Sequence, residues 1–289
     1  MMSTMRPRRS VLYMPAANER ALDKAKSLPA DALIFDLEDA VSPDAKPDAR
    51  RNAVAAARSG EYGNKEITIR CNGLETQWGA DDLTAAAMAG VSAVVIPKIN
   101  SVREVEAVSS ALATAGAPGS MKIWAMIETP TAIFDVRAIA AHPRVQTLVM
   151  GTNDLAKELR ATQIRGRAPL MHHLATALLA AREAGKIILD GVFNDIKDAD
   201  AFRDECLQGA QMGFDGKTLI HPSQVEIAND VWAPTADEVD YAQRVIAAFE
   251  EATAEGRGVI TVDGRMIENL HVDNARRVLA VQQAIESLS

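Results

Sequence analysis

The sequence predicts a (β/α)8 TIM barrel that is followed by a C-terminal helical arm or lid. Short apolar runs alternate with longer Ala-rich helical stretches eight times between residues 10 and 231. This alternation is typical of parallel sheets that are wrapped by helices. Several runs are almost wholly apolar, as expected of strands that are covered on both faces. Polar residues follow at least six of the runs.

The elements can be placed along the chain from this rhythm. The predicted strands are 10–14, 32–36, 66–70, 93–97, 122–127, 146–150, 186–190 and 215–220. The predicted helices are 18–28, 44–58, 79–89, 101–115, 131–141, 170–184, 197–209 and 222–231. An open doubly wound sheet is the competing interpretation, but no Gly-rich phosphate turn follows the first strand. A barrel also gathers the polar strand ends around one mouth, whereas an open sheet separates them.

The alternation stops after residue 231, which predicts a barrel over 1–231 and an arm or lid over 232–289. The tail contains one helix that ends near Gly256, an extended segment with an Asp263-Gly264 turn, and a final helix. A barrel does not need such a tail. We therefore expect it to cover the mouth or to pack on a neighbouring subunit.

Composition excludes several classes of function. The 289 residues carry a formal net charge of −8, so the phosphate backbone of a nucleic acid is repelled overall. Cys71 and Cys206 have neither metal-type spacing nor the pattern of a disulfide framework, which suits a reducing compartment. The N-terminus lacks the apolar stretch of a signal peptide, and no run reaches the length of a membrane span. We expect a soluble, cytoplasmic protein that binds neither membranes nor nucleic acid.

Two carboxylates stand at the ends of neighbouring predicted strands, Glu128 after 122–127 and Asp154 after 146–150. Carboxylates on adjacent rigid strands offer hard oxygen ligands to Mg²⁺ and leave positions for water and substrate. The alternative is that both residues cap helices. Glu128 is a poor cap, because Thr129 before Pro130 is the more natural one. The pair therefore predicts a magnesium site.

An arginine and a group of acids follow two other strands. Arg70 ends the third strand, and its planar guanidinium suits a substrate carboxylate. A salt bridge to the acids that end the second strand is the alternative, and both roles are compatible. Those acids are Asp36, Glu38 and Asp39, which hold metal-bound waters, orient Arg70, or pair with Arg50 and Arg51. Lys98, after the fourth strand, supplies positive charge or pairs with the same acids.

Other chemistry is not indicated. The stretch "GFDGKT" is not a phosphate loop, because Gln211 stands where the first glycine of that motif belongs. His172 and His173 lack a metal partner at suitable spacing. No Ser-His-Asp or Cys-His arrangement suggests a covalent nucleophile.

The chain resembles the citrate lyase β-subunit-like (CitE-like) branch of the HpcH/HpaI aldolase superfamily, which includes malyl-CoA and citramalyl-CoA lyases. The matching stretches occur in family order and cover nearly the whole chain: "RRSVLYMPAANERALDKA", "FDLEDAV", "IRCNG", "VVIPK", "IETPTAI", "GTNDLA", "DGVFNDIKD" and "GKTLIHPSQ". The resemblance implies a (β/α)8 barrel with Mg²⁺ on Glu128 and Asp154. It also implies that Arg70 holds the carboxylate of a 2-oxo acid.

The resemblance implies further contacts. Backbone amides around Gly151, Thr152, Asn153 and Asp154 are expected to contact the oxo acid. Coenzyme A is expected along the N-terminal stretch, where the candidate contacts are Tyr13, Pro15, Arg20 and Lys24. Relatives of this kind are commonly trimers or hexamers, in which the arm covers a neighbour's mouth. They usually carry an aspartate in a Met-Ile-Asp setting of the arm, whereas this chain has Glu268.

These features predict reversible carbon–carbon cleavage of a 3-hydroxyacyl-CoA to acetyl-CoA or propionyl-CoA and a 2-oxo acid such as glyoxylate or pyruvate. Arg70 orients the oxo acid, Glu268 from a neighbouring subunit transfers the proton, and Asp36 and Glu38 support the site. Alternatives are thioester hydrolysis, the β subunit of a citrate lyase acting on a carrier-bound thioester, and an aldolase of free hydroxy-oxo acids. A non-catalytic metabolite-binding barrel is the alternative from another class.

Overall fold

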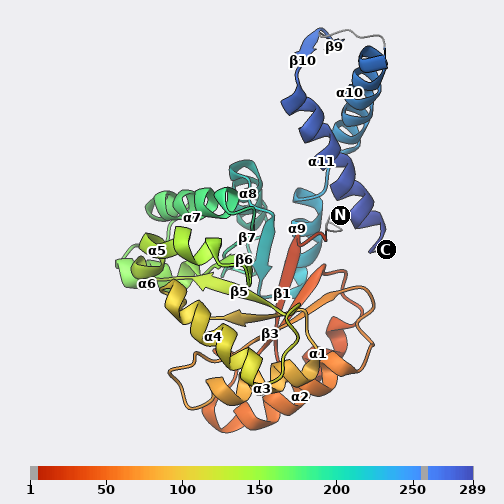
Figure 1. Cartoon of the computed structure of the whole chain (residues 1–289). Helices are drawn as coiled ribbons and strands as arrows, with labels where there is room; N and C mark the ends of the chain where they lie inside the picture. Colours follow the sequence, from red (N-terminus) through yellow and green to blue (C-terminus); the bar gives the residue numbers. More distant parts are fainter. Residues whose placement is uncertain (1–5, 255–259, 289) are drawn as a thin grey trace. The chain divides into compact units, whose positions relative to one another are not determined.

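Eight parallel strands close into one barrel with neighbouring strands in sequence order (Figure 1). The computed structural model describes residues 6–254 and 260–288. The strands are β1 (Ser10–Pro15), β2 (Ala32–Asp36), β3 (Glu66–Arg70), β4 (Ala93–Ile96), β5 (Lys122–Ile127), β6 (Val145–Met150), β7 (Ile187–Asp190) and β8 (Gly216–Leu219). Pairing of β1 with β8, from Ser10 opposite Lys217 to Leu12 opposite Leu219, closes the barrel. The predicted fold class is confirmed.

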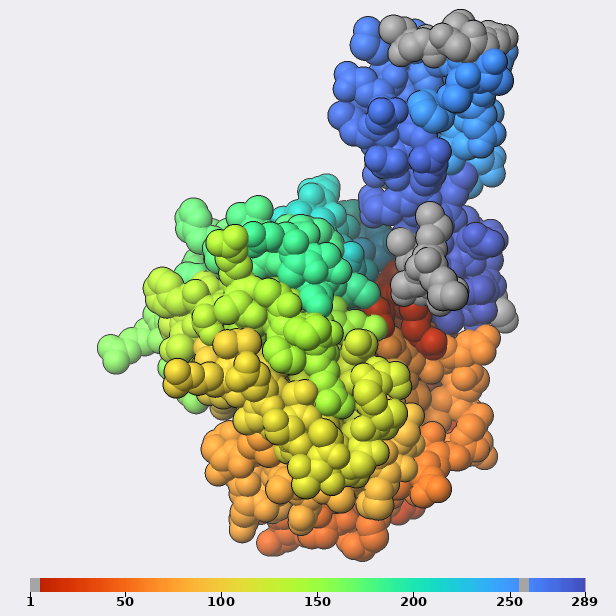
Figure 2. All heavy atoms as spheres, viewed as in Figure 1, coloured from red at the N-terminus to blue at the C-terminus, as the bar shows by residue number. Residues whose placement is uncertain are grey.

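Helices follow the strands and cover the outside of the barrel. They are α1 (Glu19–Ala25), α2 (Lys46–Arg58), α3 (Gly79–Ala89), α4 (Val102–Thr114), α5 (Pro130–Ala141), α6 (Thr152–Leu159), α7 (Met171–Glu183), α8 (Ala199–Met212) and α9 (Val225–Val231). Short 3₁₀ turns are η1 (Pro43–Ala45), η2 (Ala168–Leu170) and η3 (Pro222–Gln224). On the face shown in Figure 2, atoms of α4, α5 and α7, coloured yellow to green, form a continuous surface.

The barrel interior is filled by side chains at alternate strand positions. Ala32 and Ile34 of β2 and Trp124 and Met126 of β5 belong to one buried cluster. Residues two apart point to the same face of a strand, so these pairs face inward together. A packed interior leaves only the rim of the barrel for polar chemistry.

The structure adds one helix to the sequence prediction. Helix α6 begins immediately after β6, where only a loop and the helix 170–184 were expected. Its eight residues bury only Thr152, Leu155 and Ala156, which is too short an apolar stripe for a clear periodic signal. Thr129 caps α5 as predicted, because its hydroxyl accepts a hydrogen bond from Ala132 N at 3.0 Å.

The chain separates into two compact units, one spanning Arg8–Val231 and the other including the segment from Trp232 onward. The second unit contains α10 (Ala236–Ala254), β9 (Ile260–Val262), β10 (Arg265–Ile267) and α11 (Asn269–Glu286). The two strands pair antiparallel around the predicted Asp263-Gly264 turn. Val245, Ile260, Ile267 and Val272 contribute to a core within this unit. Gly256, expected near the end of the first helix, lies outside the described residues.

None of the helices within 6–254 and 260–288 is long and apolar enough to cross a bilayer.

Candidate functional site

A cavity of about 360 Å³ opens at the carboxyl ends of the strands. Residues from the ends of seven strands, or just after them, line it: Tyr13, Pro15, Asp36, Asp39, Ala40, Arg70, Met126, Glu128, Met150, Gly151, Thr152, Asn153, Asp154, Val192, Thr218 and Ile220. This edge is where parallel barrels carry their active sites. The candidate residues therefore converge on one cavity although they are dispersed along the sequence.

Glu128 is a buried carboxylate at the end of β5, and its side chain faces the loop after β4. Glu128 is 3% exposed, and its Oε1 accepts a hydrogen bond from the backbone N–H of Lys98 at 2.7 Å. Burial raises the pKa of Glu128 to about 7, and the nearby Asp154 adds to this rise. The Lys98 N–H and the charges of Arg70 and Lys98 oppose the rise without cancelling it.

Gly151 allows this carboxylate to lie where it does. A Cβ at position 151 would stand 2.3 Å from both Cβ and Oε2 of Glu128. Any side chain here would displace the glutamate. The glycine at the start of "GTNDLA" thus provides space between β5 and β6 for the carboxylate.

Asp154 lies in the first turn of α6, so it is held by a helix that starts at the rim. Its side chain is 30% exposed, and Oδ1 is 3.8 Å from Nζ of Lys98. Lys98 adopts a left-handed backbone conformation with φ of 49°, which brings its N–H and its ammonium group to the two different acids. Lys98 was predicted to supply positive charge or to pair with Asp36, Glu38 or Asp39, but the acid that it pairs with is Asp154.

The donor set at Glu128 and Asp154 fits a hard divalent cation. A buried glutamate with a raised pKa is a carboxylate that lacks compensating positive charge, and a bound cation would supply it. Within the described ranges, no group of three or more His, Cys, Asp or Glu side chains is placed to hold a metal. A two-carboxylate site leaves the other positions to water and substrate, which is common for Mg²⁺.

Arg70 is held in a fork by Asp36. Its Nε and Nη2 each donate to Asp36 at 2.7 Å, and its remaining nitrogen, Nη1, lies 2.8 Å from Glu38 and 3.3 Å from Asp39. The guanidinium carbon also lies 4.8 Å from the centre of the Tyr13 ring. The salt bridge predicted as an alternative is therefore present. Nη1 is the nitrogen that Asp36 does not hold.

The expected pairing of these acids with Arg50 and Arg51 is wrong. Arg50 instead bonds to Asp82 at 2.8 Å and reaches Asp81, while Arg51 pairs with Asp48 one helical turn away. The reason is geometric, since both arginines project from α2 toward α3 or along α2 itself. The acids after β2 have Arg70 as their shared partner.

Glu38 is the most perturbed acid of the group. Burial raises its pKa to about 8, the charge of Arg70 opposes this, and Asp39, Glu128 and Asp36 add to it. Its Oε2 is buried and is not oriented for a hydrogen bond with any described residue, despite its closeness to Arg70. Such a carboxyl is a proton donor near neutral pH, which is a property of catalytic acids.

A set of buried side chains that sequence reasoning did not identify holds the acidic loop in place. Lys46 Nζ donates to the carbonyls of Leu37 and Glu38 at 2.9 and 3.0 Å. Asn72 donates to Leu37 O at 2.9 Å and to Asp82 at 2.6 Å. No sequence pattern marks these partners, because they come from α2, the loop after β3, and α3.

The remaining candidates are divided between the cavity, the exposed surface of α1 and the other unit. Tyr13 and Pro15 line the cavity, whereas Arg20 and Lys24 are exposed on α1. Glu268 is exposed at the start of α11, and its N–H donates to Nδ1 of His271 at 3.0 Å. It belongs to the second unit, so its role in the site stays a prediction.

A parallel barrel with a buried arginine and two carboxylates suited to a cation at its mouth has the architecture of a barrel enzyme. The chain belongs to the HpcH/HpaI aldolase/citrate lyase family, whose model matches residues 9–222. The predicted resemblance to a CitE-like member of this superfamily is confirmed.

Individual relatives cover nearly the whole chain. A (3S)-malyl-CoA thioesterase of Cereibacter sphaeroides is 49% identical over 279 residues, which is 96% of both chains. Citrate lyase subunit beta of Escherichia coli is 36% identical over 281 residues, covering 95% of this chain and 93% of its own. The structure of CitE from Mycobacterium tuberculosis in complex with magnesium, acetoacetate and coenzyme A matches 94% of this chain and 96% of its own. Its TM-score is 0.76 at 28% identity.

Proposed function

We propose that the protein hydrolyses the thioester of a malyl-CoA-type substrate at the mouth of the barrel. The observation that carries this proposal is the 49% identity, over 96% of both chains, to a (3S)-malyl-CoA thioesterase. The cavity supports it, because an arginine and two carboxylates suited to a cation line it, and the perturbed acid Glu38 contacts that arginine. This outcome was the alternative rather than the first prediction from sequence.

Arg70 is assigned the free carboxylate of the malyl group. Its Nη1 exchanges the Glu38 and Asp39 contacts for the substrate, while Asp36 keeps the fork fixed through Nε and Nη2. A fixed guanidinium loses little freedom on binding and positions the acyl chain. The first N–H groups of α6, which lack partners within the helix, lie beside the same cavity and suit substrate oxygens.

Glu128 and Asp154 are assigned to Mg²⁺. When bound there, the ion supplies positive charge that polarises a substrate carbonyl. Glu38 is assigned a proton-transfer role, because its raised pKa leaves it able to give and accept a proton near neutral pH. Hydrolysis adds the oxygen of water to the thioester carbonyl, breaks the carbon–sulfur bond and returns a proton to the thiolate. Coenzyme A is assigned to Tyr13, Pro15, Arg20 and Lys24.

Carbon–carbon cleavage of the same substrate is the second candidate. It is supported by the aldolase/citrate lyase family and by the 36% identity to citrate lyase subunit beta. In this reaction the bond between the hydroxyl-bearing carbon and the methylene group next to the thioester breaks, which gives acetyl-CoA and glyoxylate from malyl-CoA. Glu268, from a neighbouring subunit in a trimer or hexamer, is assigned the proton transfer. A carrier-protein thioester in place of the CoA ester is the variant that the citrate lyase relatives suggest.

The test follows two products at once. Purified protein is incubated with (3S)-malyl-CoA and Mg²⁺, while free thiol and 2-oxo acid are measured in the same reaction. Hydrolysis gives thiol and malate without glyoxylate, whereas cleavage gives glyoxylate and acetyl-CoA without free thiol. Absence of both products, with activity recovered on a malyl-carrier thioester, would overturn the assignment to a free CoA ester.

A further inference from the structure

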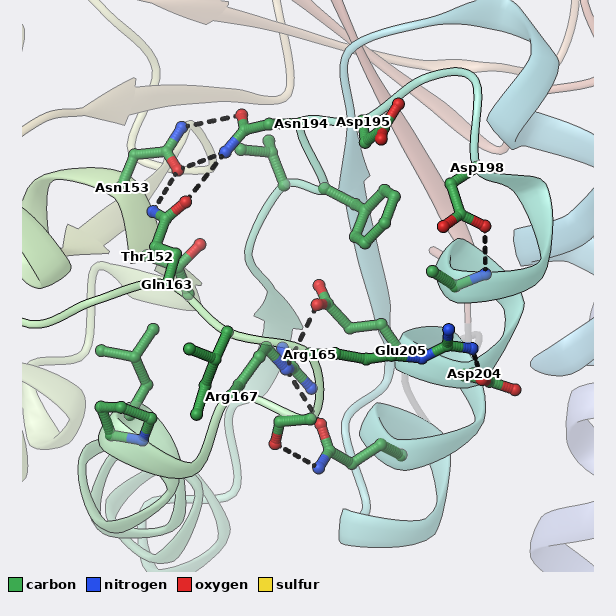
Figure 3. A pocket seen from close by; sticks show the side chains of 18 of the residues that line it. Thr152, Asn153, Gln163, Arg165, Arg167, Asn194, Asp195, Asp198, Asp204 and Glu205 are labelled. Carbon is green, nitrogen blue, oxygen red and sulfur yellow. Dashed lines mark hydrogen bonds and ion pairs between the residues drawn. The ribbon is translucent and has the colours of Figure 1, made fainter.

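A larger cavity lies beside the barrel mouth, and the amide groups of one of its walls bond to one another (Figure 3). This cavity of about 570 Å³ lies among α6, η2, α8 and the loops that follow α6 and β7. Asn153 accepts hydrogen bonds from Gln163 at 3.0 Å and from Asn194 at 2.8 Å. The Arg167 nitrogen that has no hydrogen-bond partner among the described residues is itself buried. The mouth cavity differs, because a hydroxyl group with a poor partner lies at its floor.

Tyr13 reaches across the interior of the barrel below the mouth. Tyr13 and Val11 are two residues apart on β1, so both side chains face inward. The Tyr13 hydroxyl lies 4.0 Å from Sδ of Met126 on β5, and β1 and β5 are opposite strands of the barrel. Both residues line the mouth cavity, and Tyr13 is partly exposed although the interior below it is packed. Its exposed part therefore faces the mouth cavity, and Tyr13 forms part of the floor.

The Tyr13 hydroxyl is a donor without a good acceptor. A thioether sulfur accepts hydrogen bonds only weakly, and Met126 Sδ is the one partner of this hydroxyl among residues 6–254 and 260–288. Burial raises the pKa of Tyr13, the charge of Arg70 opposes the rise, and nearby carboxylates add to it. The phenol is therefore neutral near pH 7, and its proton is available to a better acceptor.

Arg70 needs a second donor beside it to hold a substrate carboxylate. Its guanidinium already faces three acids, Asp36, Glu38 and Asp39, at 2.7, 2.8 and 3.3 Å. An incoming anion therefore meets a positive charge that is largely balanced. A neutral hydroxyl group adds a hydrogen bond to the anion without adding a further charge. Tyr13 is placed to supply this bond, because the Arg70 guanidinium carbon lies 4.8 Å from the centre of the Tyr13 ring.

The hydroxyl also lies toward the acids that suit a cation. Met126 and Glu128 are two residues apart and both line the cavity, so the Met126 side chain lies below that of Glu128 on the inner side of the barrel. A hydroxyl that contacts Met126 is therefore below Glu128, while the ring that carries it is beside Arg70. A substrate that bridges Arg70 and a cation on Glu128 passes over Tyr13.

We propose that the Tyr13 hydroxyl donates a hydrogen bond to the substrate carboxylate that Arg70 binds, so that the two residues together recognise the acid end. The inference rests on the proposed function, because that function assigns the carboxylate to Arg70. Among the residues assigned to coenzyme A, Tyr13 thus contacts the acyl end of the thioester. The preferred substrates are 3-hydroxyacyl-CoA esters with a carboxylate on the hydroxyl-bearing carbon.

Steady-state kinetics with (3S)-malyl-CoA and Mg²⁺ test the contact in Tyr13→Phe, which removes only the hydroxyl group. Consumption of malyl-CoA is followed, so that hydrolysis and carbon–carbon cleavage both count. We expect KM to rise about 10- to 100-fold, the factor that corresponds to a hydrogen bond with a charged group. The kcat should change less, because the carboxylate is not a reacting group in hydrolysis.

A truncated ligand and a second tyrosine serve as controls. 3-Hydroxybutyryl-CoA carries a methyl group in place of the carboxylate, so calorimetry should give the same Kd for it in Tyr13→Phe and wild type. Tyr62→Phe removes a buried hydroxyl that donates to the carbonyl of Leu22 at 3.0 Å. It should lower the melting temperature and leave KM unchanged, whereas Tyr13→Phe should raise KM and leave the melting temperature unchanged.

An unchanged KM for malyl-CoA in Tyr13→Phe overturns the contact, and so does an equal loss of affinity for both esters. If the wild-type protein does not consume malyl-CoA, the proposed function fails, and calorimetry with the unconsumed ester then compares the same two proteins. Equal Kd values overturn the contact, and weaker binding by Tyr13→Phe supports it. No binding of malyl-CoA to the wild-type protein overturns both the contact and the proposed function.

Discussion

Glu128 shows how a single residue depends on its neighbours for a functional position. Burial and Asp154 push its pKa upward to about 7, and the space that it occupies exists because residue 151 is glycine. Packing thus fixes the position of the Glu128 carboxyl group, while burial and the charge of Asp154 disfavour its ionised form. A site arranged this way costs stability in the absence of a cation and gains it on binding one.

Glu128→Gln and Asp154→Asn are each expected to reduce Mg²⁺-dependent turnover by about 10²–10³, the size of effect seen when one electrostatic element of a site is lost. Calorimetric titration with Mg²⁺ should show weakened binding in both. Glu158→Gln, an exposed acid on the same α6, is the control and should behave as wild type. Near-normal turnover in both site variants contradicts the metal assignment.

Gly151→Ala is expected to destabilise the fold by about 1–3 kcal/mol, the usual effect of overpacking, and to reduce turnover along with it. The added methyl group would stand 2.3 Å from Glu128 Cβ and Oε2, so the carboxylate must move. Urea unfolding and steady-state kinetics measure the two effects. Gly119→Ala is the matched control, because nothing lies within 4 Å of its added Cβ; equal behaviour of the two variants would refute the close-approach argument.

Glu38→Gln is expected to stabilise the protein in a pH-dependent manner. The pKa of Glu38 is raised to about 8 in the folded state, so the folded state holds this proton more tightly than the unfolded chain. Stability is therefore lost as pH rises from the ordinary glutamate pKa of about 4.3 toward 8. The melting temperature of the variant should match that of wild type near pH 4 and lie several degrees higher near pH 9. Each kcal/mol of unfolding free energy corresponds to roughly 2–4 °C in melting temperature.

Thermal melts across this pH range measure the effect of Glu38. Glu226→Gln, an exposed acid on α9, serves as the control and should give no pH-dependent difference. A shift of equal size at every pH would show that the Glu38 carboxyl does not titrate as described.

At the scale of elements, the barrel brings polar strand ends together and then fixes them with partners from helices. The ends of β7 and β8 illustrate this. Asp190 ends β7, and Lys217 of β8, Arg167 before η2 and Glu205 of α8 surround it. Burial alone would raise the pKa of Asp190, but Lys217 and Arg167 lower it below its ordinary value. This network ties the loop after α6 to the barrel.

Lys217→Met is expected to cost about 3–5 kcal/mol of unfolding free energy, because it leaves a buried carboxylate pair with one cation instead of two. Chemical denaturation measures this loss. The control Lys197→Met removes an exposed lysine from the loop between β7 and α8, and its unfolding free energy should stay within about 0.5 kcal/mol of wild type. A small effect of Lys217→Met would mean that solvent already reaches the network.

At the scale of the whole molecule, the arm is a compact unit with its own core, built from both helices and the hairpin. It carries Glu268 at an exposed position next to Leu270, which is 61% exposed. Neither residue contributes to the core of the arm. An exposed acid beside exposed apolar surface is consistent with the expectation that the arm acts on another subunit.

Subunit complementation tests that expectation. Glu268→Gln is expected to reduce carbon–carbon cleavage by about 10²–10⁴, the usual contribution of a proton-transfer group, and Glu128→Gln by about 10²–10³ through loss of a metal ligand. If the arm serves a neighbour's site, co-expressed mixtures of the two variants should regain activity, since some sites pair an intact mouth with an intact arm. The control mixes Glu268→Gln with the double variant Glu128→Gln/Glu268→Gln. It should regain no activity, because no arm in that mixture carries Glu268. Mixed oligomers without recovery would contradict action across subunits.

The sequence by itself determined the barrel and most of the mouth, because strand and helix periods are local and because parallel strands carry their carboxyl ends to one rim. The positions of Glu128, Arg70 and Asp36 follow from that rule, whereas Asp154 is held in the first turn of α6, which the sequence did not predict. Only the tertiary structure decided which charges pair. Arg50 forms its ion pair with Asp82 rather than with the acids after β2, and Lys217 of β8 pairs with Asp190 of β7. Pairing depends on distances between elements, and hydrophobic periodicity carries no record of those distances.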